Sequence, residues 1–170
     1  MVSEATRALW AKSGTKEGKE WHSLLAHLLD VAACAWVILE REPASTRALY
    51  AADLGLTEPQ ALAWVCALAG LHDLGKASPA FQQKWREGQK HAQNSGFLWP
   101  TGSTPRDVPH NVTTQITLPN LLRRCGWKRP AAWRIADAIG AHHGFRAQEE
   151  ELARQRDFGI GSATTPMTLA

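Results

Sequence analysis

Cysteine pairs, long apolar runs and a secretion signal are all missing from this chain of 170 residues. The three cysteines, Cys34, Cys66 and Cys125, form no CxxC pair, so neither a disulfide framework nor a cysteine zinc site is expected. We expect them to be reduced core residues of a cytoplasmic protein. The longest apolar run, Val31 to Leu39, is far too short to span a bilayer, and the first residues lack the order of basic and then apolar residues found in signal peptides.

Two further observations limit the function. No GxxxxGK(S/T) phosphate-binding loop occurs, so no nucleotide cofactor is expected in this chain. Lys and Arg total 19 against 16 Asp and Glu, and the resulting net charge of +3 permits a nucleic-acid partner without requiring one. With 44% hydrophobic and 21% charged residues, the chain is expected to form a single domain over residues 1–170.

Helical periodicity covers most of the chain and predicts an all-α fold, with no strand pattern and no internal repeat. The predicted helices cover residues 21–40, 45–54, 59–71, a short segment from Ser78-Pro79, 111–124, 130–142 and 147–156. In the first of them, apolar residues repeat at three- and four-residue steps and predict one buried stripe: Leu24, Leu25, Leu28, Leu29, Ala32, Trp36 and Leu39. Residues 1–19 and 88–109 are predicted to be loops, and 159–170 a frayed tail. Gly75 should break the chain, and Pro119 should kink its helix or delay its start.

The dipeptide His72-Asp73 ends the apolar segment from Ala61 to Leu71. A carboxylate beside an imidazole at the end of a buried helix needs compensation, and a divalent transition metal supplies it. One such pair is weak support, because most are structural. The chain contains six further histidines: His22, His27, His91, His110, His142 and His143. Several lie at the ends of predicted helices, and helical bundles can bring such ends together in one pocket.

Each histidine also has an ordinary structural explanation. His27 alone would more often be a hydrogen-bonded core residue, and His110 alone an exposed or capping residue. The pair His142-His143 would usually be a cationic cap, which the helix dipole favours at a C-terminus. Together with His72-Asp73 they favour a metal site.

The order of these motifs resembles the HD-superfamily nuclease domain of the type I CRISPR-associated helicase–nuclease. The stretches that carry the resemblance are Leu9 to Ser13, His22 to Ala33 with its HLLDVAA, Leu71 to Lys76 with its HDLGK, Phe81-Gln82, His110, and Ala141 to Phe145 with its HHGF. HD alone is unspecific, whereas these stretches in this order are specific together. They define a domain core over about residues 8–146, with 147–170 as a short helix and tail.

The resemblance implies a helical bundle that binds two metal ions between its helices. The implied ligands are His27, His72, Asp73, His110, His142 and His143. Asp73 would bridge the ions, and Lys76 would contact phosphate or assist protonation, so these two are the catalytic candidates. His22 is expected to lie outside the ligand shell. A histidine-rich set favours Mn, Fe, Co, Ni or Zn over Mg, which prefers oxygen ligands.

The chain departs from this family in one important segment. The family has a further ligand aspartate downstream of HHG, in a segment like A-D-W-x-G-S. No such segment occurs here, and Asp157, within Arg156 to Ser162, is only faintly similar and is interpreted as a coincidence. We therefore expect the bundle to lack its last helices and the first metal to lack one carboxylate ligand.

By resemblance, the activity would be metal-dependent cleavage of single-stranded DNA in antiviral CRISPR interference. A crRNA-guided surveillance complex (Cascade) would expose the strand and a helicase would deliver it. Candidate DNA contacts are Lys84, Arg86 and Lys90 beside Trp85, and Arg123, Arg124, Lys128 and Arg129 beside Trp127. A solvated basic face explains them equally well.

Two other functions stay open. One is an HD phosphohydrolase acting on nucleotides or small phosphoesters, which would have a closed pocket and would not cleave a polymer. The other is a catalytically weak domain that docks to a helicase or to a surveillance complex, which the missing aspartate favours. The number of bound metal ions separates the nuclease from the docking domain.

Overall fold

The structure is a computed structural model that describes residues 2–13, 20–99, 108–144 and 146–157. Residues 154–157 are described by their backbone alone. In chain order the elements are α1 (Glu4–Ala8), β1 (Trp10–Ser13), β2 (Trp21–Ser23), α2 (Leu24–Arg41), α3 (Ala44–Leu54), α4 (Glu58–Gly70), the 3₁₀ segment η1 (Leu71–Ala77), α5 (Pro79–Gln82), α6 (Arg86–Asn94), α7 (His110–Arg124), α8 (Arg129–Gly140) and α9 (Glu149–Asp157). The predicted all-α class is confirmed. The predicted tail at 159–170 lies outside the described residues.

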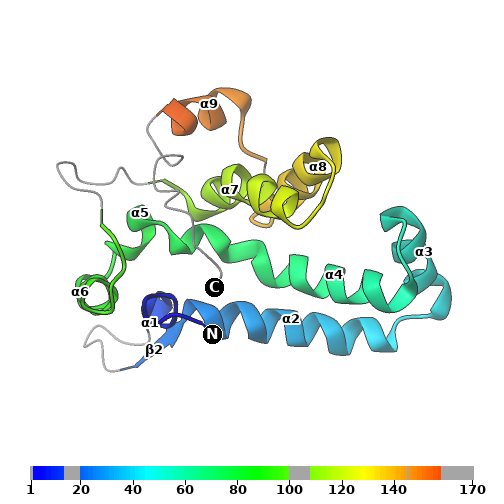
Figure 1. The fold of residues 1–170 in the computed structure, drawn as a ribbon, viewed down its shortest axis with the longest axis horizontal. Helices are drawn as coiled ribbons and strands as arrows, with labels where there is room; N and C mark the ends of the chain where they lie inside the picture. Colours follow the sequence, from blue (N-terminus) through cyan, green and yellow to red (C-terminus); the bar gives the residue numbers. More distant parts are fainter. Residues whose placement is uncertain (1, 14–19, 100–107, 145, 158–170) are drawn as a thin grey trace.

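The helices lie in two layers on either side of the α4–η1 rod (Figure 1). Helices α2 and α4 run side by side in opposite directions, and α7 and α8 pack on the other side of the rod. The main hydrophobic core lies between α4, α7 and α8 and contains Leu68, Leu118, Leu122, Ala132 and Ala136. Alanines on α8 allow a close approach to α7, and this core fixes the position of both helices relative to η1.

Segment η1 packs against the start of α7 so closely that position 75 has no room for a side chain. A Cβ on Gly75 would lie 1.9 Å from the carbonyl oxygen of His110 and 2.7 Å from the amide nitrogen of Thr114. The Gly75 amide donates to Thr114 Oγ1 (2.8 Å), and that hydroxyl donates to the carbonyl of His72 (3.1 Å) or of His110 (3.0 Å). The prediction that the break falls at Gly75 was wrong, because the non-helical φ and ψ of η1 lie at Asp73, and Gly75 serves the close approach to α7.

Helix α1 and strand β1 replace part of the loop expected at residues 1–19. Strand β2 takes the first three residues of the helix expected at 21–40, which begins at Leu24 instead. Strands β1 and β2 pair antiparallel, with Trp10 opposite Ser23. The fully buried Gln82 side chain holds β1 in place, because its Oε1 accepts from the Trp10 amide (3.1 Å) and its Nε2 donates to the carbonyls of Trp10 (2.8 Å) and Lys76 (2.7 Å). A strand held by a side chain so distant in sequence leaves no local periodicity to detect.

The loop expected at residues 88–109 is in part helical. Helix α6 continues to Asn94, while residues 100–107 lie outside the described residues. A Cβ on Gly88 would lie 2.2 Å from the Trp85 ring, so the α6 backbone itself packs on that indole. The glycine that reads as a loop signal is a packing site here.

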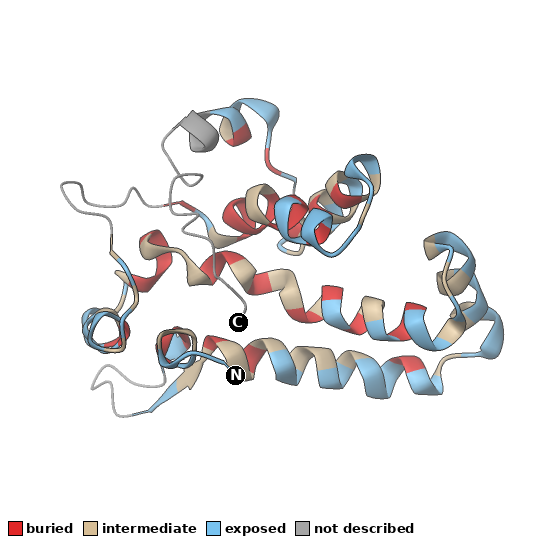
Figure 2. Ribbon diagram, viewed as in Figure 1, coloured by how far each residue is buried: buried red, intermediate tan, exposed pale blue. Residues whose placement is uncertain are grey.

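The buried stripe predicted for α2 is only partly confirmed. Leu24 and Leu39 are buried, but Leu29 and Trp36 are exposed because, among the described elements, α2 packs mainly on one side, against α4. The large exposed apolar side chains of α2 are Leu29 (60%), Trp36 (40%), Val37 (48%) and Ile38 (60%). Figure 2 shows exposed segments recurring along α2.

The predictions for the cysteines and for the start of α7 are also confirmed only in part or wrong. Cys66 is buried, but Cys34 and Cys125 are exposed, so two of the three expected core cysteines were wrong. Helix α7 begins at His110 and continues through Pro119, so the prediction of a late helix start was wrong.

No described helix is by itself long and apolar enough to cross a membrane. Only the pair Ala44–Leu54 and Glu58–Ala77, taken together, has the length and composition for it, and that pair is bent by 82°.

Thr114→Val should lower the free energy of unfolding by about 1–3 kcal/mol, because it leaves the buried Gly75 amide without its acceptor. The matched control is Thr117→Val, which removes only a hydrogen bond to the Thr113 carbonyl (2.8 Å) one turn back in the same helix. Urea denaturation followed by circular dichroism measures both. Equal losses in the two variants would contradict a special role for the contact between η1 and α7.

Candidate metal centre

The structure brings all six predicted ligand side chains together beside η1. They are His27 from α2, His72 and Asp73 from η1, His110 from the start of α7, and His142 and His143 from the turn after α8. Each lies at an element end or in a helix middle that the core holds in place. The sequence expectation of a site between helices is therefore met in its geometry.

The Asp73 carboxylate lies between two sets of histidines. Its Oδ2 lies 2.9 Å from His27 Nε2 and 3.1 Å from His72 Nε2. Its Oδ1 lies 3.0 Å from His110 Nε2 and 3.4 Å from His142 Nε2. Asp73 is only 4% exposed. One buried carboxylate thus presents one oxygen to each set, as a bridging ligand would.

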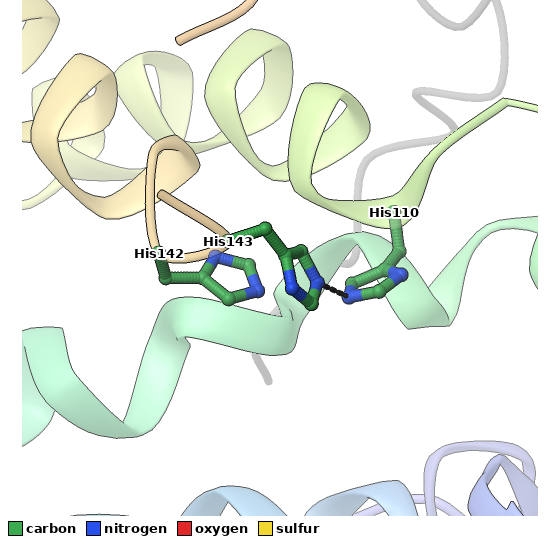
Figure 3. A group of neighbouring side chains, drawn as sticks. All are labelled: His110, His142 and His143. Atoms are coloured by element: carbon green, nitrogen blue, oxygen red, sulfur yellow. Dashed lines mark hydrogen bonds between the residues drawn. The ribbon is translucent and has the colours of Figure 1, made fainter. Parts of the chain in front are cut away.

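Each set is compact enough to surround one ion. Ligand atoms within 4.8 Å of one another form two groups, one of His27, His72 and Asp73, the other of His110, His142 and His143. Figure 3 shows the second group, in which His142 and His143 turn toward His110. The Nε2 atoms of His110 and His143 are 3.0 Å apart, so two ring nitrogens face each other across a space that a proton or a cation would fill.

Backbone carbonyls orient two of the rings. His72 Nδ1 lies 3.0 Å from the Ala69 carbonyl and His142 Nδ1 lies 2.9 Å from the Ile139 carbonyl, so each Nδ1–H donates to a carbonyl. The Nε2 of His72 faces Asp73 Oδ2 at 3.1 Å, whereas the Nε2 of neutral His142 carries the lone pair. His142 Nε2 is buried and makes no hydrogen bond to any described residue. An imidazole held by a carbonyl on one nitrogen and unpaired on the other is the usual arrangement of a metal-binding histidine. The residues present therefore fit a divalent metal ion.

Burial changes the pKa values of these histidines. Burial lowers the pKa of His27, although the hydrogen bond with Asp73 opposes it, and burial also lowers the pKa of His142. Both are thereby favoured in the neutral form that binds metals. His72 differs, because its hydrogen bond with Asp73 raises its pKa more than burial lowers it.

Asp73 itself stays ionised. Burial alone would raise its pKa, but hydrogen bonds from His110, His72 and Lys76 outweigh burial and hold the pKa far below the usual range. Lys76 Nζ lies 2.7 Å from Asp73 Oδ2 and 5.4 Å from the centre of the Phe81 ring. The site therefore contains a buried carboxylate with a buried ammonium group beside it.

The remaining acidic and histidine candidates lie outside both sets. His22 pairs with Asp30 (3.0 Å), and its ring centre lies 6.1 Å from that of His27, in agreement with the expectation that it is a neighbour of the site. His91 is exposed on α6. Asp157 is the last residue of α9, and its side chain lies outside the described part of the chain.

The two predicted basic patches differ in their distance from the metal centre. Lys84 Nζ lies 5.9 Å from the centre of the Phe81 ring, which in turn lies 5.7 Å from the His110 ring. Arg124 comes 14 residues after His110 on α7, about 21 Å away at 1.5 Å per residue, and Lys128 follows the end of that helix. Only the patch around Lys84 is close enough to serve the centre directly.

The sequence did not reveal the residues that position the ligands. Thr114 joins η1 to α7, and Gln82 joins η1 to β1, yet both are ordinary polar residues within helical patterns. Trp127, expected beside DNA, packs on Trp64 with ring centres 5.0 Å apart and lies against the main core. Its role in the described structure is packing.

An HD pair in a helical bundle, with histidines converging from neighbouring helices, defines a domain of the HD superfamily. A family model described as "Cas3, HD domain" matches residues 10–165. The chain therefore belongs to the Cas3 HD domain family.

Relatives and solved structures agree with this assignment. The chain is 52% identical over 155 residues to the CRISPR-associated endonuclease/helicase Cas3 of Thermus thermophilus; the match covers 91% of this chain and 16% of that protein. The T. thermophilus Cas3 HD domain, crystallised in the presence of Ni²⁺, matches with a TM-score of 0.65 and 48% identity, over 91% of this chain and 56% of that one. T. fusca Cas3–ATP matches with a TM-score of 0.67 and 26% identity, over 88% and 17%.

Asp73→Asn should weaken Ni²⁺ or Mn²⁺ binding at least about tenfold, because it removes the charged oxygen shared by both sets. Isothermal titration calorimetry on metal-free protein measures the change. Asp30→Asn is the matched control, since Asp30 is an exposed carboxylate that also pairs with a histidine. Equal affinities for the wild type and Asp73→Asn would exclude Asp73 as a ligand.

The separate sets predict separate metal losses. His27→Ala and His143→Ala should each reduce two bound ions to one, because each removes a ligand from a different set. Metal analysis after dialysis against buffered Mn²⁺ or Ni²⁺ counts the ions per chain. A wild-type count of one would contradict the expectation of two ions.

Proposed function

We propose that this chain is a metal-dependent nuclease module that cuts single-stranded DNA in CRISPR interference. In this role it uses two transition-metal ions and works with a helicase and a crRNA-guided surveillance complex, Cascade. The observation that carries the proposal is the Asp73 carboxylate, whose oxygens face two sets of histidines. The histidine-rich ligand set favours Mn, Fe, Co, Ni or Zn over Mg.

The reaction needs charge neutralised on both sides of a phosphodiester. Two divalent ions in such a site lower the pKa of an attacking water and neutralise the phosphate oxygens. Asp73 keeps the two histidine sets adjacent, since it contacts both. Lys76 adds a fixed positive charge at Asp73 Oδ2, where it can hold a phosphate oxygen or give a proton to the leaving oxygen.

The substrate and partners rest on the relatives and on surface charge. The T. thermophilus relative is named an endonuclease/helicase, and this chain spans only 16% of it, so a helicase is the partner that this similarity supports. Lys84, Arg86 and Lys90 are exposed on one segment and suit a nucleic-acid backbone, and Lys84 lies over the Phe81 ring, which neighbours His110. The surveillance complex and the antiviral role follow from the family resemblance.

One observation favours a weaker, docking form of the domain. Among the described residues, Asp73 is the only carboxylate in the two ligand sets, and it belongs to both sides of the site. A first ion bound by His27, His72 and a shared carboxylate has few protein ligands. The cleavage experiment decides between the two forms.

Purified chain should nick circular single-stranded DNA when Mn²⁺, Fe²⁺ or Ni²⁺ is added, and Asp73→Ala should reduce the rate at least about a hundredfold. A circle excludes contaminating exonucleases. Hydrolysis of nucleotides without cleavage of the circle would indicate the phosphohydrolase instead. Bound metal with neither activity would indicate the docking form.

Lys76→Met should lower the cleavage rate about ten- to a hundredfold while leaving both ions bound, because the buried ammonium acts on phosphate rather than on metal. Lys12→Met, at an exposed lysine on β1 outside the two ligand sets, is the matched control. Single-turnover cleavage and metal analysis separate the two effects. An unchanged rate in Lys76→Met would remove Lys76 from the catalytic set.

A further inference from the structure

An exposed tryptophan lies on β2, one residue before His22, which neighbours the metal centre. Trp21, in β2, is 38% exposed, and its ring centre lies 5.5 Å from that of His91 and 6.2 Å from that of Trp85. It directly precedes His22, whose ring lies 6.1 Å from His27. We propose that Trp21, with His91 and Trp85, forms a stacking surface that binds the bases of the strand that the centre cuts. The proposal rests on the proposed function and adds specific positioning residues to it.

The structure holds this surface rigidly. Trp85 packs edge-on against the buried Trp10, with ring centres 5.7 Å apart at 85°. Both indoles meet the backbone of α6, where a Cβ on Gly88 would lie 2.2 Å from Trp85 and 2.5 Å from Trp10. The Trp21 ring packs against the Trp85 ring, so it loses little conformational freedom when a base stacks on it.

Aromatic rings connect this surface to the metal centre. The Phe81 ring lies 5.7 Å from the His110 ring and 4.6 Å from the Trp10 ring. Trp10 contacts Trp85, and Trp85 contacts Trp21. A base on Trp21 therefore lies at the outer end of a row of rings whose inner end is a predicted metal ligand.

The surrounding charge suits a single strand. Lys84, Arg86 and Lys90 are exposed on the same segment that carries Trp85 and His91, and Glu87 is its one acidic residue. Cationic side chains that follow the phosphates, together with aromatic faces for the bases, are the combination that binds single strands without reading their sequence. A duplex, whose bases are already stacked, offers no free base to such a surface. The surface therefore favours single strands.

The chain offers a matched control. Trp36 is 40% exposed, close to the 38% of Trp21, but it lies on α2, two turns after the exposed Leu29 and directly before the exposed Val37. Its neighbours suit apolar contact. Removing Trp36 therefore tests the loss of an exposed indole without touching the proposed stacking surface.

The test is binding of a fluorescent oligo-dT by fluorescence anisotropy, with EDTA present so that no cleavage occurs. A second oligomer of equal length, with abasic sites throughout, keeps the phosphates and removes the bases. We expect the wild type to bind oligo-dT about tenfold more tightly than the abasic oligomer. Trp21→Leu should lose this preference by weakening oligo-dT binding alone. Trp36→Leu should keep it.

The outcomes separate this proposal from the proposed function. An unchanged preference in Trp21→Leu, or equal weakening for both oligomers, overturns the stacking role, whereas the nuclease proposal is judged by Asp73-dependent cleavage. Intrinsic fluorescence gives a second test that tolerates a poorly folded leucine variant. Oligo-dT should quench the tryptophan emission of the wild type and of Trp36→Phe more than that of Trp21→Phe. Equal quenching in all three would also overturn the proposal.

Discussion

The arrangement of the whole site depends on one buried carboxylate. Asp73 is contacted from α2, from η1, from the start of α7 and from the turn after α8, so four separate parts of the chain meet at two oxygen atoms. Each partner alone is a common histidine or lysine contact. Because burial would otherwise favour the neutral acid, the surrounding donors must stay in place for the charge to persist. The fold therefore keeps the Asp73 carboxylate ionised, as the proposed metal binding requires.

Close backbone packing between η1 and α7 sets the positions of the two histidine sets relative to each other. Gly75 allows η1 to lie directly on α7, and Thr114 fixes the register of that contact. His72 and His110 are positioned from the two sides of the same contact. A shift between the two elements would move one histidine set relative to the other, so packing at one glycine controls the spacing of the proposed two-metal centre.

Most of the candidate ligands could be located in the sequence because they lie where a sequence pattern changes, whereas His27, inside the helical pattern of α2, depended on the family resemblance. The apolar segment before His72-Asp73, the helix start at His110 and the helix end before His142 are all visible locally. The parts of the fold that the sequence did not predict depend on contacts between segments that are distant in the chain. The strands, held by Gln82, and the helix that contains Gly88 left no periodic signal, and apolar spacing on α2 could not show which side had a neighbour. The ligand roles themselves stay predictions until metal is counted.

The exposed apolar side of α2 also changes the thermodynamics of the domain. Leu29, Val37 and Ile38 already contact water in the folded state, so unfolding hydrates less new apolar surface at these positions than it would if they were buried. Their contribution to the heat-capacity increment of unfolding, usually about 12–15 cal/mol/K per residue over a whole domain, is reduced accordingly. Stability would vary less steeply with temperature, and covering that side of α2 would restore the curvature of a more fully buried domain.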